Sequence, residues 1–276
     1  MENKVPDHQS IKIVQWNVLA KWASDTNAFP EVNPALLIFE YRFPLILKKI
    51  EEFGADIYTF EEVDFVKDLD IFFEDKGYNT LSYAKVSGQD SLYIAYNPEK
   101  LGIQEEKNFN FFEPENPEKK MNQVYKYIKF ETLNCVNRKE FVLISTHLKA
   151  KAANYEIRAV QTSQILEKLK IENPKKLPTV ILGDLNSDPE EESISNIVKE
   201  GFKSALVDAE FSTTTYKIRS KKLFNRMIDY IFFKGEIEIS KGIEVYKECL
   251  FQEGVGLPSD WMPSDHLPIS ATLKFV

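Results

Sequence analysis

The run from Val180 to Pro189 constrains the fold of this chain most, because it joins an apolar segment to ligand-type side chains. Its first part (VIL) is apolar, and the following GDLNSDP consists largely of turn residues. This pattern predicts a buried strand that delivers Asp184 and Asn186 to its exposed end, where Gly183 allows close backbone approach. The carboxylate suits Mg²⁺ or water and the amide suits an oxyanion. Turn chemistry alone also selects these residue types, so an ordinary Asp-rich turn stays open.

Size and composition fit one domain. The chain has 276 residues, of which 43% are hydrophobic and 13% aromatic, enough for one large core of an α/β sandwich or barrel. We expect residues 1–10 to form a flexible tail without a secretory or transit signal, and residues 11–276 to form a single domain. Two cysteines, Cys135 and Cys249, imply no disulfide framework and favour a reducing, cytoplasmic compartment.

The charge and the hydropathy pattern bear on what the protein binds. The formal net charge is −8, whereas proteins that bind long nucleic acids usually carry a basic stripe. An acidic balance favours a small phosphorylated substrate or a carboxylate-rich metal site, although local patches can oppose the total. No run approaches the roughly 18 apolar residues of a membrane helix, so no membrane partner is expected.

Apolar periodicity and turn signals predict an alternation of strands and helices. Gly54 ends the first helix, whose start lies near Phe43 if Pro44 occupies the first turn. The Pro-rich, charged segment 113–120 is predicted to be a loop. This order favours two sheets packed face to face and flanked by helices. The predicted helices are 40–53, 66–76, 156–170 and 193–200, and the predicted strands are 11–19, 55–60, 78–84, 91–96, 123–132, 141–146, 180–182, 213–218, 226–233, 237–245 and 269–275.

Polar side chains suited to phosphate chemistry follow one predicted strand after another. Catalytic groups gathered at one edge of a sheet scaffold are a common arrangement. The repetition therefore predicts a site at such an edge. The residues are Asn17, Glu62, His147, Asp184, Asn186 and Asp265-His266, with Asp229 inside an apolar strand.

The three histidines sharpen this prediction. His8 lies in the expected tail, whereas His147 and His266 lie at strand edges. A single His in such a place is more often structural, but two beside acidic partners favour chemistry. Asp229 is costly inside an apolar strand unless it is paired. A pair with His266 would supply an orienting carboxylate and a base.

Six motifs in order resemble those of the endonuclease/exonuclease/phosphatase superfamily, and they span nearly the whole chain. The chain is most similar to the deadenylase-like branch, and within it to nocturnin-like enzymes. The resemblance implies a four-layer α/β sandwich of two mixed, mainly antiparallel sheets. It also implies phosphoester hydrolysis that depends on Mg²⁺, for which Mn²⁺ can substitute. The motifs are QWNVLA (15–20), EEVD (61–64), THLKA (146–150), GDLNS (183–187), IDYI (228–231) and PSDHLP (263–268).

The resemblance also implies roles for individual residues. Glu62 would be the main metal ligand, with Asn17 beside it and Asp265 near a second ion. Asp184 would position the attacking water and Asn186 would hold the phosphate. The remaining roles are those of His266 as base or water activator, Asp229 as its orienting partner and His147 as a stabiliser of phosphoryl charge. These assignments agree with phosphoryl transfer, which needs positioning and charge neutralisation.

Within this branch, nocturnin-like enzymes remove the 2′-phosphate of NADP(H), and related enzymes shorten poly(A) from its 3′ end. Residues matching the substrate-binding cations are Lys85, Lys149, Lys151 and Arg219. Lys151 replaces the usual Arg, which loses bidentate phosphate binding. Glu61 replaces the usual Gln, the segment between Lys85 and Ser91 is short, and Ser91 stands where the pattern has Gly.

Three functions remain open at this point. The first is a metal-dependent phosphatase acting on a nucleotide such as NADP(H), and the second is a 3′–5′ exoribonuclease acting on RNA 3′ ends. The third is a catalytically silent binding module of the same fold. It is disfavoured because every position for metal binding or proton transfer is filled. Protein partners and oligomeric state cannot be inferred from the sequence.

Overall fold

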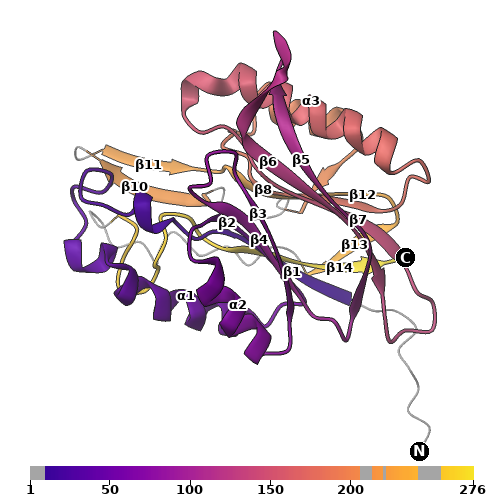
Figure 1. Ribbon diagram of the computed structural model, residues 1–276, viewed down its shortest axis with the longest axis horizontal. Coiled ribbons are helices and arrows are strands. Elements are labelled where there is room, and N and C mark those ends of the chain that lie inside the picture. The colour runs from indigo at the N-terminus through magenta and orange to yellow at the C-terminus, as the bar shows by residue number, and fades with distance from the viewer. Residues whose placement is uncertain (1–9, 206–212, 220–221, 242–255) are drawn as a thin grey trace, which may run out of the picture.

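The computed structural model describes residues 10–205, 213–219, 222–241 and 256–276. Within these residues, two six-stranded sheets pack face to face and helices cover their outer faces (Figure 1). The predicted α/β sandwich of mainly antiparallel sheets is confirmed. The helices are α1 (Phe39–Phe53), α2 (Val66–Asp75), α3 (Tyr155–Glu172) and α4 (Glu192–Lys199), with short 3₁₀ turns at Lys21–Ala23, Pro34–Leu37 and Ala152–Asn154.

The first sheet has the strand order β13-β14-β1-β2-β4-β3 and the second β5-β6-β7-β8-β12-β9. A separate two-stranded sheet pairs β10 with β11. The strands of the first sheet are β1 (Ser10–Asn17), β2 (Ile57–Val63), β3 (Asn79–Ala84), β4 (Ser91–Tyr96), β13 (Ile237–Lys241) and β14 (Ile269–Phe275). The others are β5 (Leu101–Glu113), β6 (Asn116–Thr132), β7 (Glu140–His147), β8 (Thr179–Asp184), β9 (Lys203–Ser204), β10 (Thr215–Arg219), β11 (Lys222–Arg226) and β12 (Asp229–Lys234).

Each large sheet contains one parallel pair, and this repetition places the site. The chain passes through α1 between β1 and β2, and through α3 between β7 and β8. A helical crossover is how two parallel strands are joined, and their carboxyl ends then share one edge of the sheet. Asn17, Glu62, His147 and Asp184 lie in the last residues of these four strands. The topology therefore delivers all four to one end of the sandwich.

Side-chain alternation along the strands builds the layers. Ile13 lies in the core between the two sheets, whereas the next residue, Val14, packs under α1 and α2. In the second sheet Leu143 faces the central core and Ile144 faces α3 and α4. Successive strand residues point to opposite faces, so strands covered on both sides are apolar throughout. This explains why β7 and β8 read as continuous apolar runs.

Helix α1 differs from the sequence prediction at its start. It begins at Phe39, so Pro44 lies beyond the first turn rather than within it. Proline lacks an N–H, which removes one hydrogen bond inside the helix, and packing of Ile46 and Ile50 against the first sheet offsets that loss. The predicted end is confirmed, because Gly54 caps the helix in the left-handed conformation.

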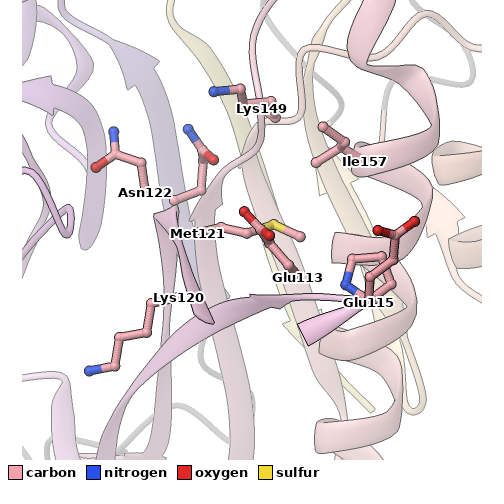
Figure 2. Close-up of a pocket in the computed structure, with 9 residues that line it drawn as sticks. Glu113, Glu115, Lys120, Met121, Asn122, Lys149 and Ile157 are labelled. Atoms are coloured by element: carbon pink, nitrogen blue, oxygen red, sulfur yellow. The ribbon is translucent and has the colours of Figure 1, made fainter. Parts of the chain in front are cut away.

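The segment 113–120 is not the loop that the sequence predicts. Strands β5 and β6 form a long hairpin that turns at Pro114 and Glu115, and β5 was missed altogether. Irregular pairing near the tip tolerates the prolines. The hairpin reaches over α3, and a pocket of about 320 Å³ lies between them (Figure 2).

Other differences concern the last third of the chain. The predicted strand 226–233 is two strands, because β11 ends at Arg226 and β12 begins at Asp229. The predicted strand 237–245 is described only to Lys241, where β13 ends. Ser10 already belongs to β1, and the rest of the predicted tail, residues 1–9, lies outside the described residues, as does Cys249. None of the described helices has the length and apolar character needed to cross a membrane.

Candidate active site

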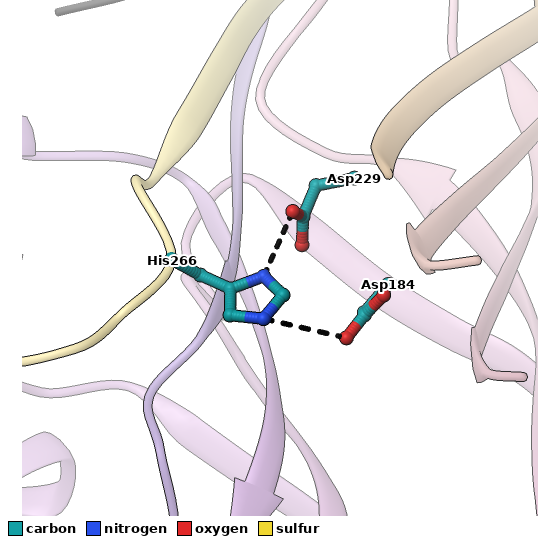
Figure 3. Close-up of side chains that lie close together, drawn as sticks. All are labelled: Asp184, Asp229 and His266. Carbon is teal, nitrogen blue, oxygen red and sulfur yellow. Dashed lines mark hydrogen bonds and ion pairs between the residues drawn. The ribbon is translucent and has the colours of Figure 1, made fainter. Parts of the chain in front are cut away.

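Asp184, Asp229 and His266 pack together at the shared edge of the two sheets (Figure 3). His266 Nδ1 lies 2.9 Å from Asp229 Oδ2, and His266 Nε2 lies 3.8 Å from Asp184 Oδ2. All three side chains are buried. The Asp229–His266 hydrogen bond predicted from the sequence is therefore confirmed. It fixes the imidazole with Nε2 toward Asp184.

Strand register brings this group together. Asp229 begins β12 and pairs directly with Asp184, the last residue of β8. The hydroxyl of Thr214 accepts a hydrogen bond from the Asp229 backbone N–H at 3.1 Å, which fixes where β12 starts. His266 lies just before β14, and the indole of Trp16 donates to its backbone carbonyl at 2.8 Å. The Asp229–His266 hydrogen bond thus joins the two sheets.

Gly183 allows β7 and β8 to approach closely at the site. A Cβ at this position would lie 1.8 Å from the Thr146 carbonyl oxygen, and the Gly183 φ of 143° also disfavours other residues. The next pair in register is His147 and Asp184. Their side chains lie 3.5 Å apart, from His147 Nε2 to Asp184 Oδ2. The glycine therefore sets the second histidine beside the central carboxylate.

Asn17 and Glu62 form the neighbouring corner. Asn17 Nδ2 donates to Glu62 Oε1 at 3.1 Å and to Asp184 Oδ2 at 3.0 Å. Glu62 has a φ of 59°, and it lies where the β2–β4 register shifts between Phe60 and Val63. Such strained bulges re-aim side chains and are found near active sites. This one leaves Glu62 partly exposed at the site.

The surroundings set the charges of the histidines and of Asp184. Burial lowers the pKa of His266, but Asp229 and Asp184 outweigh it and raise that pKa to about 10. Burial raises the pKa of Asp184 to about 7, against the opposing charge of His266. Burial, with the charges of Lys85 and His266, holds the pKa of His147 well below its ordinary value. One imidazolium and one neutral imidazole therefore flank Asp184 at neutral pH.

Asn186 fixes the position of Asp184 through hydrogen bonds. Its backbone N–H donates to Asp184 Oδ1 at 2.9 Å, and its side-chain Nδ2 donates to the Leu148 carbonyl at 3.2 Å. Its φ of 52° lies in the left-handed region that Asn tolerates better than most residues. These contacts fix Asp184 against the loop after His147. The predicted contact between Asn186 and a phosphate stays a prediction.

Asp265 already has a cationic partner. Lys217 Nζ lies 2.5 Å from Asp265 Oδ2. Burial raises the pKa of Asp265, but the positive charges of Lys217 and His266 together with the Lys217 hydrogen bond outweigh it and lower that pKa to about 2. Sequence reasoning missed Lys217. Its place two residues from Thr215 and from Arg219 on β10 puts it on the same face of the strand as both, which could have indicated a role at the site. The predicted role of Asp265 beside a second ion stays a prediction.

Two further residues that sequence reasoning missed support the site through buried hydrogen bonds. Arg42 is fully buried in α1 and donates to the Pro263 carbonyl at 2.6 Å and the Val18 carbonyl at 2.7 Å. It thus ties the loops that follow Asn17 and precede Asp265. A signal was present in the sequence, because a residue four positions before the core-facing Ile46 lies on the same face of the helix and is therefore buried.

The second missed residue is Gln15. Its Nε2 donates to Glu61 Oε2 at 2.8 Å and to Asp229 Oδ1 at 3.1 Å. Glu61 is fully buried, and burial together with the charge of Asp229 raises its pKa well above its ordinary value. Gln15 therefore links two buried carboxyl groups behind the catalytic edge.

The four predicted cations occupy different surroundings. Lys85 is buried and pairs with Asp90 at 2.7 Å, close enough to His147 to affect its pKa. Lys149 lines the pocket beneath the β5–β6 hairpin, and Lys151 is exposed. Arg219 ends β10, and its side chain lies outside the described part of the structure. Convergence of all four on a phosphate stays a prediction.

The corner at Asn17, Glu62 and Asp184 fits a hard divalent cation. The Asn17 amide nitrogen donates to a carboxylate oxygen of Glu62 and of Asp184, while the amide oxygen accepts from the Leu19 N–H. Hard cations are bound by carboxylate oxygens such as these two. Asp184, Asp229 and His266 also have ligand atoms within 4.8 Å of one another, and they too could hold an ion. Among the described residues the oxygen corner fits better, because hard cations prefer oxygen ligands and one ring nitrogen of His266 is already bonded to Asp229.

Comparisons with known proteins agree with this geometry. The family model described as "Endonuclease/Exonuclease/phosphatase family" matches residues 14–266. Human nocturnin is 26% identical over 294 residues, covering 97% of this chain but 66% of nocturnin. A probable Ccr4 3′–5′-exoribonuclease subunit of the CCR4-Not complex from Vairimorpha ceranae is 23% identical over 304 residues, covering 94% of this chain and 63% of that protein. The chain thus spans about two thirds or less of these relatives.

Solved structures share the fold. ANGEL2, described as a 2′,3′-cyclic phosphatase in complex with adenosine-2′,3′-vanadate, superposes with a TM-score of 0.85 at 18% identity, covering 99% of this chain and 97% of that one. The human nocturnin catalytic domain with bound sulfate gives a TM-score of 0.77 at 22% identity, with 98% of each chain covered. At these identities the likeness shows the fold alone.

Proposed function

The chain belongs to the endonuclease/exonuclease/phosphatase family, and from that premise we propose that it is a Mg²⁺-dependent hydrolase that removes the 2′-phosphate of NADP(H). One observation carries the hydrolase proposal. The Asp229–His266 pair, Asp184 and the Asn17–Glu62 corner meet at one edge of the sandwich. These groups can orient a water, balance charge on a phosphoryl group and bind a divalent ion, which are the needs of phosphoryl transfer.

The metal would be held at Asn17, Glu62 and Asp184, where Mg²⁺ or Mn²⁺ supplies charge neutralisation for the phosphate. The carboxylates of Glu62 and Asp184 meet at the Asn17 amide, which supports this assignment. Lys217 already neutralises Asp265, which favours a single ion over two. Oxygen ligands favour these hard ions over zinc.

The protein's own groups position the reactants. A water that hydrogen-bonds to both Asp184 Oδ2 and His266 Nε2, which lie 3.8 Å apart, is oriented by both. Asp229 keeps the ring of His266 in place, so that its protonated Nε2 donates to the water and orients it. His147, 3.5 Å from the same Asp184 oxygen, stabilises charge on the phosphoryl oxygens. Asn186 holds Asp184 through its backbone N–H and holds the phosphate through its side chain.

The choice of NADP(H) rests on the nocturnin relatives and on the cations near the site. Lys85 acts electrostatically on His147, and Lys149 follows His147 by two residues. A terminal phosphate is a dianion and needs a compact cationic site rather than a long basic stripe. The second candidate is a 3′–5′ exoribonuclease that releases AMP, which the Ccr4 relative favours.

One experiment separates the two candidates. The purified protein is incubated with Mg²⁺ and either NADPH or a 5′-labelled oligoadenylate, and the products are identified. We expect inorganic phosphate from NADPH, no product in excess EDTA, and none from Glu62→Gln, with Glu74→Gln on the exposed face of α2 as the matched control. AMP released from oligoadenylate far faster than phosphate from NADPH would replace the first candidate by the second.

A further inference from the structure

The pocket beneath the β5–β6 hairpin, called the arm pocket here, is formed by the hairpin tip, the start of β6's regular pairing and the first turn of α3. In Figure 2, Met121 and Glu113 lie at its centre, Ile157 faces them from α3, and Lys149 lies above. Its volume is about 320 Å³. That is the small end of ligand pockets, which span about 300–1,000 Å³. The complete lining is Glu113, Pro114, Glu115, Lys120, Met121, Asn122, Gln123, Lys149 and Ile157.

The arm pocket adjoins the candidate active site through short backbone links. Thr146, which precedes His147, donates from its hydroxyl to the Val124 carbonyl at 3.1 Å. The next residues along β6 toward the tip, Gln123 and Asn122, line the pocket. On the other side, Lys149 lines the pocket two residues beyond His147. The arm pocket therefore lies next to the strand end and loop that carry His147.

A second link runs to the loop that carries Lys85. The Asn122 side-chain oxygen accepts from the Ser87 backbone N–H at 2.8 Å, and the Asn122 carbonyl accepts from Val86 at 3.1 Å. The pocket is thereby fixed between the two loops that hold Lys85 and Lys149. Because the Asn122 oxygen is used internally, its amide nitrogen is the group that can donate to a ligand.

The lining has the chemistry of a base-binding site. Met121, Pro114 and Ile157 offer apolar surfaces for a planar ring, while Asn122 and Gln123 offer amide groups for its edge. Planar bases bind mainly by such stacking and by a few hydrogen bonds to the edge.

Two carboxylates at the arm pocket disfavour the binding of a phosphate there. Glu113 and Glu115 form part of the wall of the arm pocket. Glu113 is neutralised in part by Lys119 at 2.9 Å, whereas Glu115 is exposed at the turn. A continuing phosphodiester chain would bring negative charge against them, at a cost in binding free energy. The wall therefore admits an uncharged ring more readily than a longer RNA chain.

We propose that the arm pocket binds the uncharged base of the nucleotide whose phosphate is hydrolysed, and that Glu115 disfavours RNA chains whose phosphates pass the hairpin tip. This inference rests on the proposed phosphomonoesterase function and names the part of the substrate that sets its specificity. It assigns recognition to a hairpin that lies outside the six motifs.

Binding without turnover tests the pocket first. Calorimetric titration in EDTA compares adenosine 2′-monophosphate with the base-free 1-O-methylribose 2-phosphate. We expect about tenfold tighter binding of the nucleotide, the size of one base-stacking contribution. Ile157→Trp, which fills the pocket, should reduce this ratio to near one. Val160→Trp, one turn along α3 and outside the pocket lining, should leave the ratio unchanged.

Equal binding of the two ligands by the wild-type protein, or an unchanged ratio in folded Ile157→Trp, overturns the proposal. These results do not depend on activity. Absence of phosphate release from NADPH, with the expected binding ratios, refutes the proposed function but leaves the base site in place.

The role of Glu115 has its own test. Glu115→Lys should tighten binding of a 5′-labelled oligoadenylate about threefold, because each added phosphate contact strengthens binding. Glu118→Lys makes the same charge change on the same hairpin but outside the pocket lining, and should have a smaller effect. Equal effects of the two substitutions overturn selection by Glu115.

Discussion

Asp184 is the residue on which the other site residues converge. Its Oδ2 lies 3.0 Å from Asn17 Nδ2, 3.5 Å from His147 Nε2 and 3.8 Å from His266 Nε2. Its Oδ1 is held by the Asn186 backbone N–H. A carboxylate surrounded by donors on several sides is fixed in orientation. This geometry supports the proposed roles, in which Asp184 places the water and His266 acts on it.

The Asp229–His266 pair can be tested by a substitution that keeps shape. In Asp229→Asn, the amide has only one acceptor oxygen, but Gln15 and His266 each require one. The imidazole loses its orientation, and we expect kcat to fall by about 10²-fold or more, the range for a positioned acid or base. The measurement is steady-state phosphate release, with Asp260→Asn at an exposed position as the control. Near-normal kcat in folded Asp229→Asn would show that the pair is structural.

Glu61 predicts a stability effect that depends on pH. Its Oε1 is buried and has no hydrogen-bond partner among the described residues, and its pKa is raised in the folded protein. The folded state therefore holds this proton more tightly than the unfolded state, whose Glu has a pKa of about 4.3. Stability from this group is present below that value and is lost as pH rises through the folded pKa.

Glu61→Gln removes this ionisation. We expect the variant to be more stable than the wild type at pH 8, by about 1 kcal/mol, a usual size for single substitutions. The difference should vanish at about pH 3, where Glu61 is protonated in both states. Urea unfolding at the two pH values measures it. An equal difference at both values would mean that ionisation of Glu61 is not the cause.

For individual strands and helices, the sequence predicts the structure well where the residue pattern depends only on interactions within that element. The apolar runs of β7 and β8, the cap of α1 at Gly54 and the strand-end polar residues all follow from local chemistry. Strand β5 was missed because its central residues are charged, and Lys126 on β6 is buried by pairing with Glu106 and Asn108. Only the pairing of the two strands, which is not local, makes this charged stretch a strand.

The same limit applies to the site. The Asp229–His266 pair was predictable because a carboxylate inside an apolar strand demands a partner. Arg42 and Gln15 were not predicted, because their partners lie far away in the chain: Arg42 binds the Pro263 carbonyl and Gln15 binds Asp229. A polar residue in an apolar pattern shows that a buried group needs a hydrogen-bond partner. The tertiary fold determines which residue is that partner.

Gly183 tests how closely β7 and β8 must pack. Gly183→Ala places a Cβ 1.8 Å from the Thr146 carbonyl oxygen. The parallel pair must separate, so we expect a loss of about 3 kcal/mol or more in the free energy of unfolding. Activity should also fall, because His147 and Asp184 are the next pair in register. Gly102→Ala in β5 is the control, since its Cβ meets only the Leu133 side chain at 3.6 Å.

Denaturant unfolding and phosphate release measure the two effects. Wild-type stability in Gly183→Ala would show that the strands yield easily and that the glycine is not required for their approach.

At the scale of the whole molecule, the site is the place where the two sheets are joined. Asn17 and Glu62 come from the first sheet, whereas Asp184 and Asp229 come from the second. Gln15 in β1 donates to Asp229 in β12, and Asn17 in β1 donates to Asp184 in β8. The catalytic edge therefore also holds the sandwich together, and a ligand bound there affects the stability of the whole fold.

A bound divalent ion should accordingly stabilise the whole domain. Because the proposed ligands belong to both sheets, unfolding must release the ion, and stabilisation grows as RT ln(1 + [L]/Kd). At a hundredfold excess over Kd this gives about 2.7 kcal/mol. We expect Mg²⁺ to raise the wild-type melting temperature and EDTA to reverse the shift. Glu62→Gln should lose the shift and Glu74→Gln, on the exposed face of α2, should keep it. A shift that survives in Glu62→Gln would place the ion elsewhere, with Asp184, Asp229 and His266 as the next group to test.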